Sequence, residues 1–145
     1  MSSPLSLVYL TVLYLKLAHH LQRLVQELYG RLKDLEARYR TYQGFDQLLK
    51  IPSECPESPI FALVSEHPRN LAKYCQEHGF VVRAVVPPTV PIGTQRVRVC
   101  LHSGNTVGEV HRFIARIGEW VEMTLATASQ GSAGLVEHKY YLNKL

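Results

Sequence analysis

The chain has 145 residues, of which 46% are hydrophobic and 19% are charged, and its formal net charge is +4. This size and balance are typical of one soluble globular domain and exclude a low-complexity or largely disordered chain. The basic residues are scattered along the chain instead of clustering with aromatic residues, so we expect no nucleic-acid partner.

The apolar run at residues 5–17 is the first feature in chain order. It is shorter than the roughly 20 apolar residues that a membrane-spanning helix needs. No basic residue precedes it and no small-residue cleavage site follows it, which argues against a secretory signal. We therefore expect no membrane partner, and we interpret the run as a packing helix or a buried strand.

Leucines from Leu17 to Leu35 recur at steps of three and four residues, with polar residues between them. This period predicts a long amphipathic helix that buries one stripe. The stripe fits ordinary core packing, whereas a coiled-coil or dimer seam would need a longer heptad repeat. Closely spaced prolines end the following segment, so residues 1–57 are expected to comprise the apolar segment, this helix and a connector over residues 41–57.

Helix and strand signals alternate from residue 58 to residue 122, which we interpret as a small α/β domain that includes the Pro-Pro-Thr turn and the Arg-x-Arg strand. A strand is predicted at Ile60–Val64, and a helix from Pro68 to His78, because proline suits the first helical turn. Gly79 is placed to cap that helix in the left-handed conformation, before a second strand at Phe80–Val86.

Thr106 and Glu109 have the Thr-x-x-Glu spacing of a capping box, so a helix is expected to begin there. Its apolar face would include Phe113 and Val121. Residues 123–145 are expected to form a poorly packed tail. The predicted fold class is therefore α+β, with a small, mainly antiparallel sheet whose helices cover one face.

A proline-rich turn precedes a strand that carries two arginines. The prolines within Pro87–Pro91 restrict the backbone around Thr89. The next run alternates with period two, which places Arg96, Arg98 and Cys100 on one face of a strand. Both arginines could be solvated charges on an open face, or the ordered turn could position a guanidinium group for a carboxylate.

The cysteines and histidines lack the spacing of a disulfide framework or a metal site. Cys55, Cys75 and Cys100 are odd in number and form no Cys-x-x-Cys pair. Two of the seven histidines are adjacent, and the others have no local partner pattern. We therefore expect reduced thiols, no metal and a cytoplasmic location.

Six short motifs follow one another from residue 58 to residue 106: Ser58-Pro59-Ile60, Gly79-Phe80-Val81-Val82, Pro87-Pro88-Thr89-Val90-Pro91, Gly93-Thr94, Arg96-Val97-Arg98 and Asn105-Thr106. Together they resemble the C-terminal small domain of the α-oxoamine synthases, most closely their biotin-pathway branch. The members of this family are pyridoxal-phosphate enzymes of fold type I, related to the class I and II aminotransferases, that condense an amino acid with an acyl thioester.

The resemblance implies a role for two residues. Arg98, the second arginine of the Arg-x-Arg strand, corresponds to the residue that holds the amino-acid carboxylate, and Thr89 to a residue that contacts the substrate. Arg96 receives no role. Val86 and Asn105 stand where the family commonly has arginine and histidine, respectively.

The family's cofactor, pyridoxal phosphate, is held by a lysine of a large domain, and none of the six lysines here lies in such a motif. The resemblance therefore implies a partial acyltransferase, inactive alone, without catalytic or cofactor-binding residues of its own. Its partners would be a large cofactor domain or a full-length paralogue, an amino-acid substrate and acyl-CoA, with dimerisation completing the site. The alternative is a non-catalytic remnant or interaction domain that binds a full-length paralogue or a small carboxylate.

Overall fold

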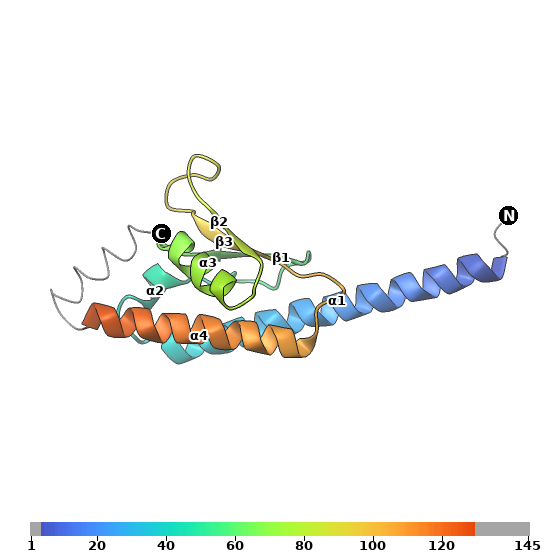
Figure 1. The fold of residues 1–145 in the computed structure, drawn as a ribbon, viewed down its shortest axis with the longest axis horizontal. Helices are drawn as coiled ribbons and strands as arrows, with labels where there is room; N and C mark the ends of the chain where they lie inside the picture. The colour runs from blue at the N-terminus through green and yellow to red at the C-terminus, as the bar shows by residue number, and fades with distance from the viewer. Residues whose placement is uncertain (1–3, 130–145) are drawn as a thin grey trace.

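The computed structural model describes residues 4–129 as a small sheet with helices on one side (Figure 1). The three strands form one antiparallel sheet in the order β1-β3-β2, which confirms the predicted α+β class. In chain order the elements are α1 (Pro4–Tyr39), α2 (Phe45–Leu48), β1 (Ile60–Val64), α3 (Pro68–Glu77), β2 (Val82–Val85), β3 (Arg96–Cys100) and α4 (Val107–Ser129).

The central strand β3 has one buried face and one open face. Val97 and Val99 are buried, whereas Arg98, which lies between them, and Cys100, which follows them, are exposed. Such strict alternation of β-branched and polar residues is what a half-buried strand requires. On the flanking strands Phe61, Leu63 and Val82 are buried on the same side as the valines of β3.

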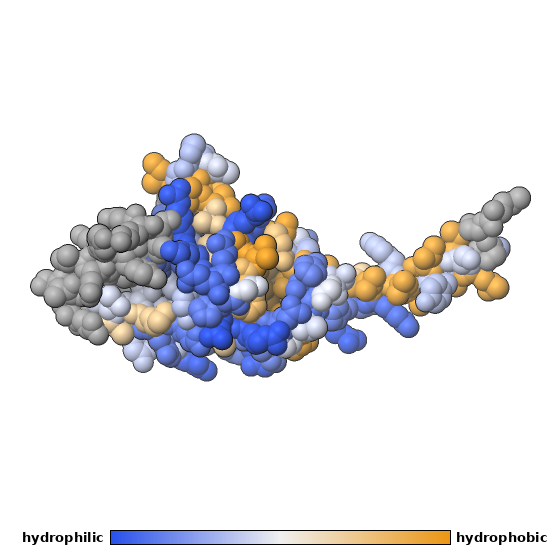
Figure 2. Space-filling model, viewed as in Figure 1, coloured by the Kyte–Doolittle hydropathy of each residue, from blue (hydrophilic) through white to orange (hydrophobic). Residues whose placement is uncertain are grey.

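Helix α1 is 36 residues long, about 54 Å at the usual rise per residue. Its second half packs against α4 (Figure 1), and the predicted leucine stripe is buried there from Leu24 to Leu35. The stripe's first residue, Leu17, is 44% exposed. The apolar run at residues 5–17 is helical, which confirms the helix among the two interpretations and makes the buried strand wrong. Its large apolar side chains are exposed and not packed as expected. Figure 2 shows this apolar end projecting from the body.

Helices α3 and α4 meet at a buried polar contact. The indole Nε1–H of Trp120 donates to Oδ1 of Asn70 at 2.6 Å, and both side chains are buried. Phe113 of α4 contacts the ring of Phe80, with centroids 5.2 Å apart. These contacts hold the helices against β2 and β3, because α3 also packs on both strands.

The predicted start of α4 is confirmed in atomic detail. The backbone N–H of Thr106 donates to Oε1 of Glu109 at 3.2 Å, and the backbone N–H of Glu109 donates to Oγ1 of Thr106 at 3.1 Å. The predicted start of α3 at Pro68 and its cap at Gly79 are also confirmed, since Gly79 has a φ of +90°.

Three boundaries differ from the prediction. The connector contains the short helix α2, which forms because Phe45 and Leu48 are buried after a turn at Gly44, whose φ is +91°. Strand β2 covers Val82–Val85 only. The expected tail begins with further turns of α4, because Thr124 is buried and its hydroxyl donates to the carbonyl of Trp120 at 2.7 Å.

The rest of the expected tail, residues 130–145, lies outside the described residues. Within residues 4–129, no helix combines the length and the apolar character needed to cross a membrane.

Candidate functional site

The loop at residues 86–95 joins β2 to β3 and projects beyond the sheet, away from the helices (Figure 1). Two turns shape it: the N–H of Thr89 donates to the carbonyl of Val86 at 3.1 Å, and that of Thr94 to the carbonyl of Pro91 at 3.0 Å. Gly93 has a φ of +89°, a conformation that favours glycine. The loop therefore has internal order, as its prolines predicted, and it presents Thr89 exposed to solvent.

The two arginines of β3 are used differently. Arg96 is half-buried, and its Nε–H donates to the carbonyl of Thr94 at 2.8 Å, which ties the side chain to the end of the loop. Arg98 is exposed at the middle of the open face. Within residues 4–129 no hydrogen bond or ion pair is found for Arg98, so its guanidinium group is available to a ligand.

The register adds an arginine that sequence analysis missed. Arg98 lies opposite Ala62 on β1 and opposite Arg83 on β2. Arg83 is exposed, so both guanidinium groups belong to the open face. In the sequence, Arg83 is only a single charged residue within the apolar strand Val82–Val85. That pattern does not indicate that Arg98 of β3 is its cross-strand neighbour. Thr89 makes no described hydrogen bond to Arg98.

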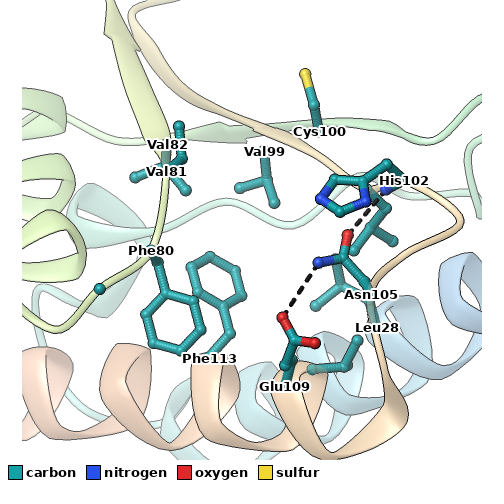
Figure 3. A pocket seen from close by; sticks show the side chains of 13 residues that line it. Leu28, Phe80, Val81, Val82, Val99, Cys100, His102, Asn105, Glu109 and Phe113 are labelled. Carbon is teal, nitrogen blue, oxygen red and sulfur yellow. Dashed lines mark hydrogen bonds between the residues drawn. The ribbon is translucent and has the colours of Figure 1, made fainter.

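A cavity of about 480 Å³ lies on the opposite, helix-covered side of the sheet (Figure 3). The apolar side chains of Phe80, Val99 and Phe113 line it. Cys100 also borders it, although its sulfur atom points away from these side chains in Figure 3. Because neighbouring residues of a strand face opposite sides, the cavity and the arginine face are separate places.

The polar groups at the cavity's edge already have partners. Asn105 Oδ1 accepts from the backbone N–H of His102 at 2.9 Å, and Asn105 Nδ2 donates to Oε2 of Glu109 at 3.3 Å. These bonds to Asn105 and Thr106 lower the pKa of Glu109, which stays ionised as the cap of α4. The cavity is therefore apolar, with hydrogen-bonded polar groups at its edge. The open face instead carries Arg83 and Arg98, for which no ion pair is found within residues 4–129.

Sequence comparisons give the chain its relatives. It is 48% identical over 103 residues to the 8-amino-7-oxononanoate synthase of Emericella nidulans, across 67% of this chain and 24% of that enzyme. The chain is a relative of the 8-amino-7-oxononanoate synthases. The synthases of Alkalilimnicola ehrlichii and Stutzerimonas stutzeri are 33% and 32% identical over 100 and 93 residues. Those matches cover 69% and 63% of this chain.

The chain spans about a quarter of the length of the curated synthases that it matches. No protein-family model matches it. Among solved structures, the serine palmitoyltransferase of Sphingomonas wittichii is similar to 70% of this chain and 25% of its own, with 19% identity and a TM-score of 0.46.

The four lysines within residues 4–129 lie at the surface of the structure. A lysine that forms a Schiff base is normally desolvated or placed beside another cation, so that its amine can lose a proton. Here Lys33 and Lys73 pair with Glu36 and Glu77 at 2.9 and 3.9 Å on helix surfaces. Lys16 and Lys50 are exposed, and none of the four lines the cavity in Figure 3.

Proposed function

We propose that this chain supplies the substrate-carboxylate-binding part of a pyridoxal-phosphate-dependent acyltransferase of the α-oxoamine synthase type, in biotin synthesis. The supporting observation is the exposed, unpaired Arg98 at the centre of the open face, in a chain that is 48% identical over 103 residues to an 8-amino-7-oxononanoate synthase. A guanidinium group presents a planar fork of donors that matches a carboxylate in two parallel hydrogen bonds.

In this function Arg98 holds the carboxylate of the amino-acid substrate, and β3 fixes the direction from which the guanidinium group approaches. Thr89 contacts the substrate from the loop, whose order the turns at Val86 and Pro91 maintain. Arg96 has no role in holding the carboxylate, because its Nε–H is bonded to the carbonyl of Thr94 instead. Holding a reactant in one orientation contributes to rate only where the reacting group is also present, so the lysine and the cofactor belong to another part or another chain.

The exposed end of α1 supports a protein partner. Leu5, Tyr9 and Tyr14 are 80%, 68% and 71% exposed, and Figure 2 shows apolar residues along this end of the helix. Contiguous exposed apolar surface is typical of interaction sites. The partner we propose is a large cofactor domain or a full-length paralogue; a purely non-catalytic interaction domain would use the same surface without Arg98.

The test is carboxylate binding followed by the NMR signals of the arginine Nε–H groups. We expect glycine or acetate to shift the Arg98 signal, and Arg98→Gln to lose at least about tenfold in affinity, as for a charged hydrogen bond. The matched control is Arg96→Gln, on the same strand, which should keep the affinity. Equal losses in both variants would overturn the roles assigned to the strand.

A second measurement tests whether the chain holds the cofactor itself. Pyridoxal phosphate is mixed with the chain, which is then desalted, and the absorbance of an internal aldimine is sought. We expect no band to survive, because the described lysines are exposed or ion-paired. A stable band that disappears in one lysine variant would show that the chain holds the cofactor itself.

A further inference from the structure

The open face of the sheet carries a cross-strand pair of like charges. Arg98 of β3 and Arg83 of β2 are direct partners in the antiparallel register. Directly opposite residues of neighbouring strands point to the same face, with Cβ atoms about 4.5–5.5 Å apart. Both side chains are exposed, so two guanidinium groups arise side by side from adjacent strands.

Nothing in the described part of the chain neutralises this pair. The ion pairs there use Arg31, Lys33, Lys73, His111 and Arg116, all on helices. No strand residue on the open face is acidic: the others are Ile60, Ala62, Val64, Val85, Arg96 and Cys100. Like charges directly opposite destabilise a sheet, and a bound anion would relieve that repulsion.

We infer that Arg83 and Arg98 together bind a small dicarboxylate, one carboxylate on each guanidinium group. For Arg98 this inference rests on the proposed function, and for Arg83 it adds a specificity-determining residue. Each guanidinium group has five N–H donors and can hold a carboxylate in two bonds. One carboxylate would leave the pair with a net positive charge, whereas two neutralise it. The pair therefore favours a substrate with two acidic groups.

Arg96 provides the matched control. It is on the same strand and face, but its cross-strand neighbours are Val64 and Val85, and its Nε–H is bonded to the carbonyl of Thr94. If carboxylate binding depends only on the positive charge of this face, Arg96→Gln should weaken it. If binding depends on the pair of Arg83 and Arg98, Arg96→Gln should leave it unchanged.

The experiment titrates the full chain and its variants with acetate, succinate and inorganic phosphate, by calorimetry and by the arginine Nε–H signals. We expect the native chain to bind succinate at least about tenfold more tightly than acetate, the size of one added charged contact. Arg83→Gln should abolish this preference and keep the acetate affinity. Arg96→Gln should keep both. Because Arg83→Gln removes a repulsion, its Tm without ligand should not fall below that of the native chain.

The outcomes separate this inference from the proposed function. If Arg98→Gln loses both carboxylates while Arg83→Gln keeps the succinate preference, the carboxylate site stands and the paired site is wrong. If Arg98→Gln changes nothing, the proposed function itself fails. Phosphate binding as tight as succinate, with the same dependence on Arg83, would overturn the dicarboxylate assignment, as would a lower Tm in Arg83→Gln.

Discussion

The hydrogen bond between Trp120 and Asn70 should dominate the stability of the seam between α3 and α4. The indole Nε1–H donates to Asn70 Oδ1 at 2.6 Å, with exposed fractions of 2% and 8% for the two residues. Asn70→Ala would bury an unsatisfied indole N–H, at a cost of about 1–3 kcal/mol in the free energy of unfolding. Trp120→Phe should cost at least as much, since it leaves the amide oxygen unpaired and also opens a cavity.

The double variant tests the physical reason for these losses. Once both partners are gone no polar group remains unsatisfied, so the double variant should be more stable than the two single losses predict, by about 0.5–3 kcal/mol. Because Trp120 is the only tryptophan of the chain, urea unfolding is followed by circular dichroism instead of fluorescence. The control is Tyr74→Phe, which removes a solvent-exposed bond to Glu119 between the same two helices and should cost less than about 1 kcal/mol. Strictly additive losses would refute the reasoning.

Two further predictions concern titratable groups. Burial raises the pKa of Cys75 to about 12, so this thiol should react with a disulfide reagent at mildly alkaline pH only after unfolding. Cys55 and Cys100 are exposed and should react rapidly. Three rapidly reacting thiols in the folded chain would contradict this prediction. The hydrogen bond from His111, and then that from Arg31, lowers the pKa of Glu27 below 4.5. The stabilising effect of the ionised Glu27 carboxylate is therefore present above its unfolded-state pKa and is lost as the pH falls through its folded-state pKa. Glu27→Gln should be less stable than the native chain near neutral pH and equally stable in acid, as measured by thermal unfolding across pH. A difference that persists in acid would mean that the pair acts through packing instead of charge.

Together these contacts would support the carboxylate site that we propose on the open arginine face. Arg83 and Arg98 lie on strands that α3 supports from behind, and α3 is joined to α4 by the buried Trp120 contact. A rigid backing allows exposed side chains to keep a defined separation. If the proposed site is correct, a loose seam between α3 and α4 would weaken carboxylate binding without any change to Arg83 or Arg98.

Local elements were predictable from the sequence because their signals are local. The strand at Ile60–Val64 follows from its apolar composition between turn residues, and the start of α4 follows from the reciprocal bonds that the Thr106–Glu109 spacing permits. The faces of β3 were predictable because side chains alternate along any strand. Arg98 was thus placed on an open face before its neighbours were known.

Only the tertiary structure decided what lies across from Arg98. The register of β2 against β3 depends on how the loop at residues 86–95 closes, and no periodic pattern encodes that pairing. The same limit explains the burial of Thr124, which depends on helix packing, and the exposure of the first half of α1, whose apolar period matches that of a buried helix. The sequence determined the chemical character of each face, and the packing determined which charges share one.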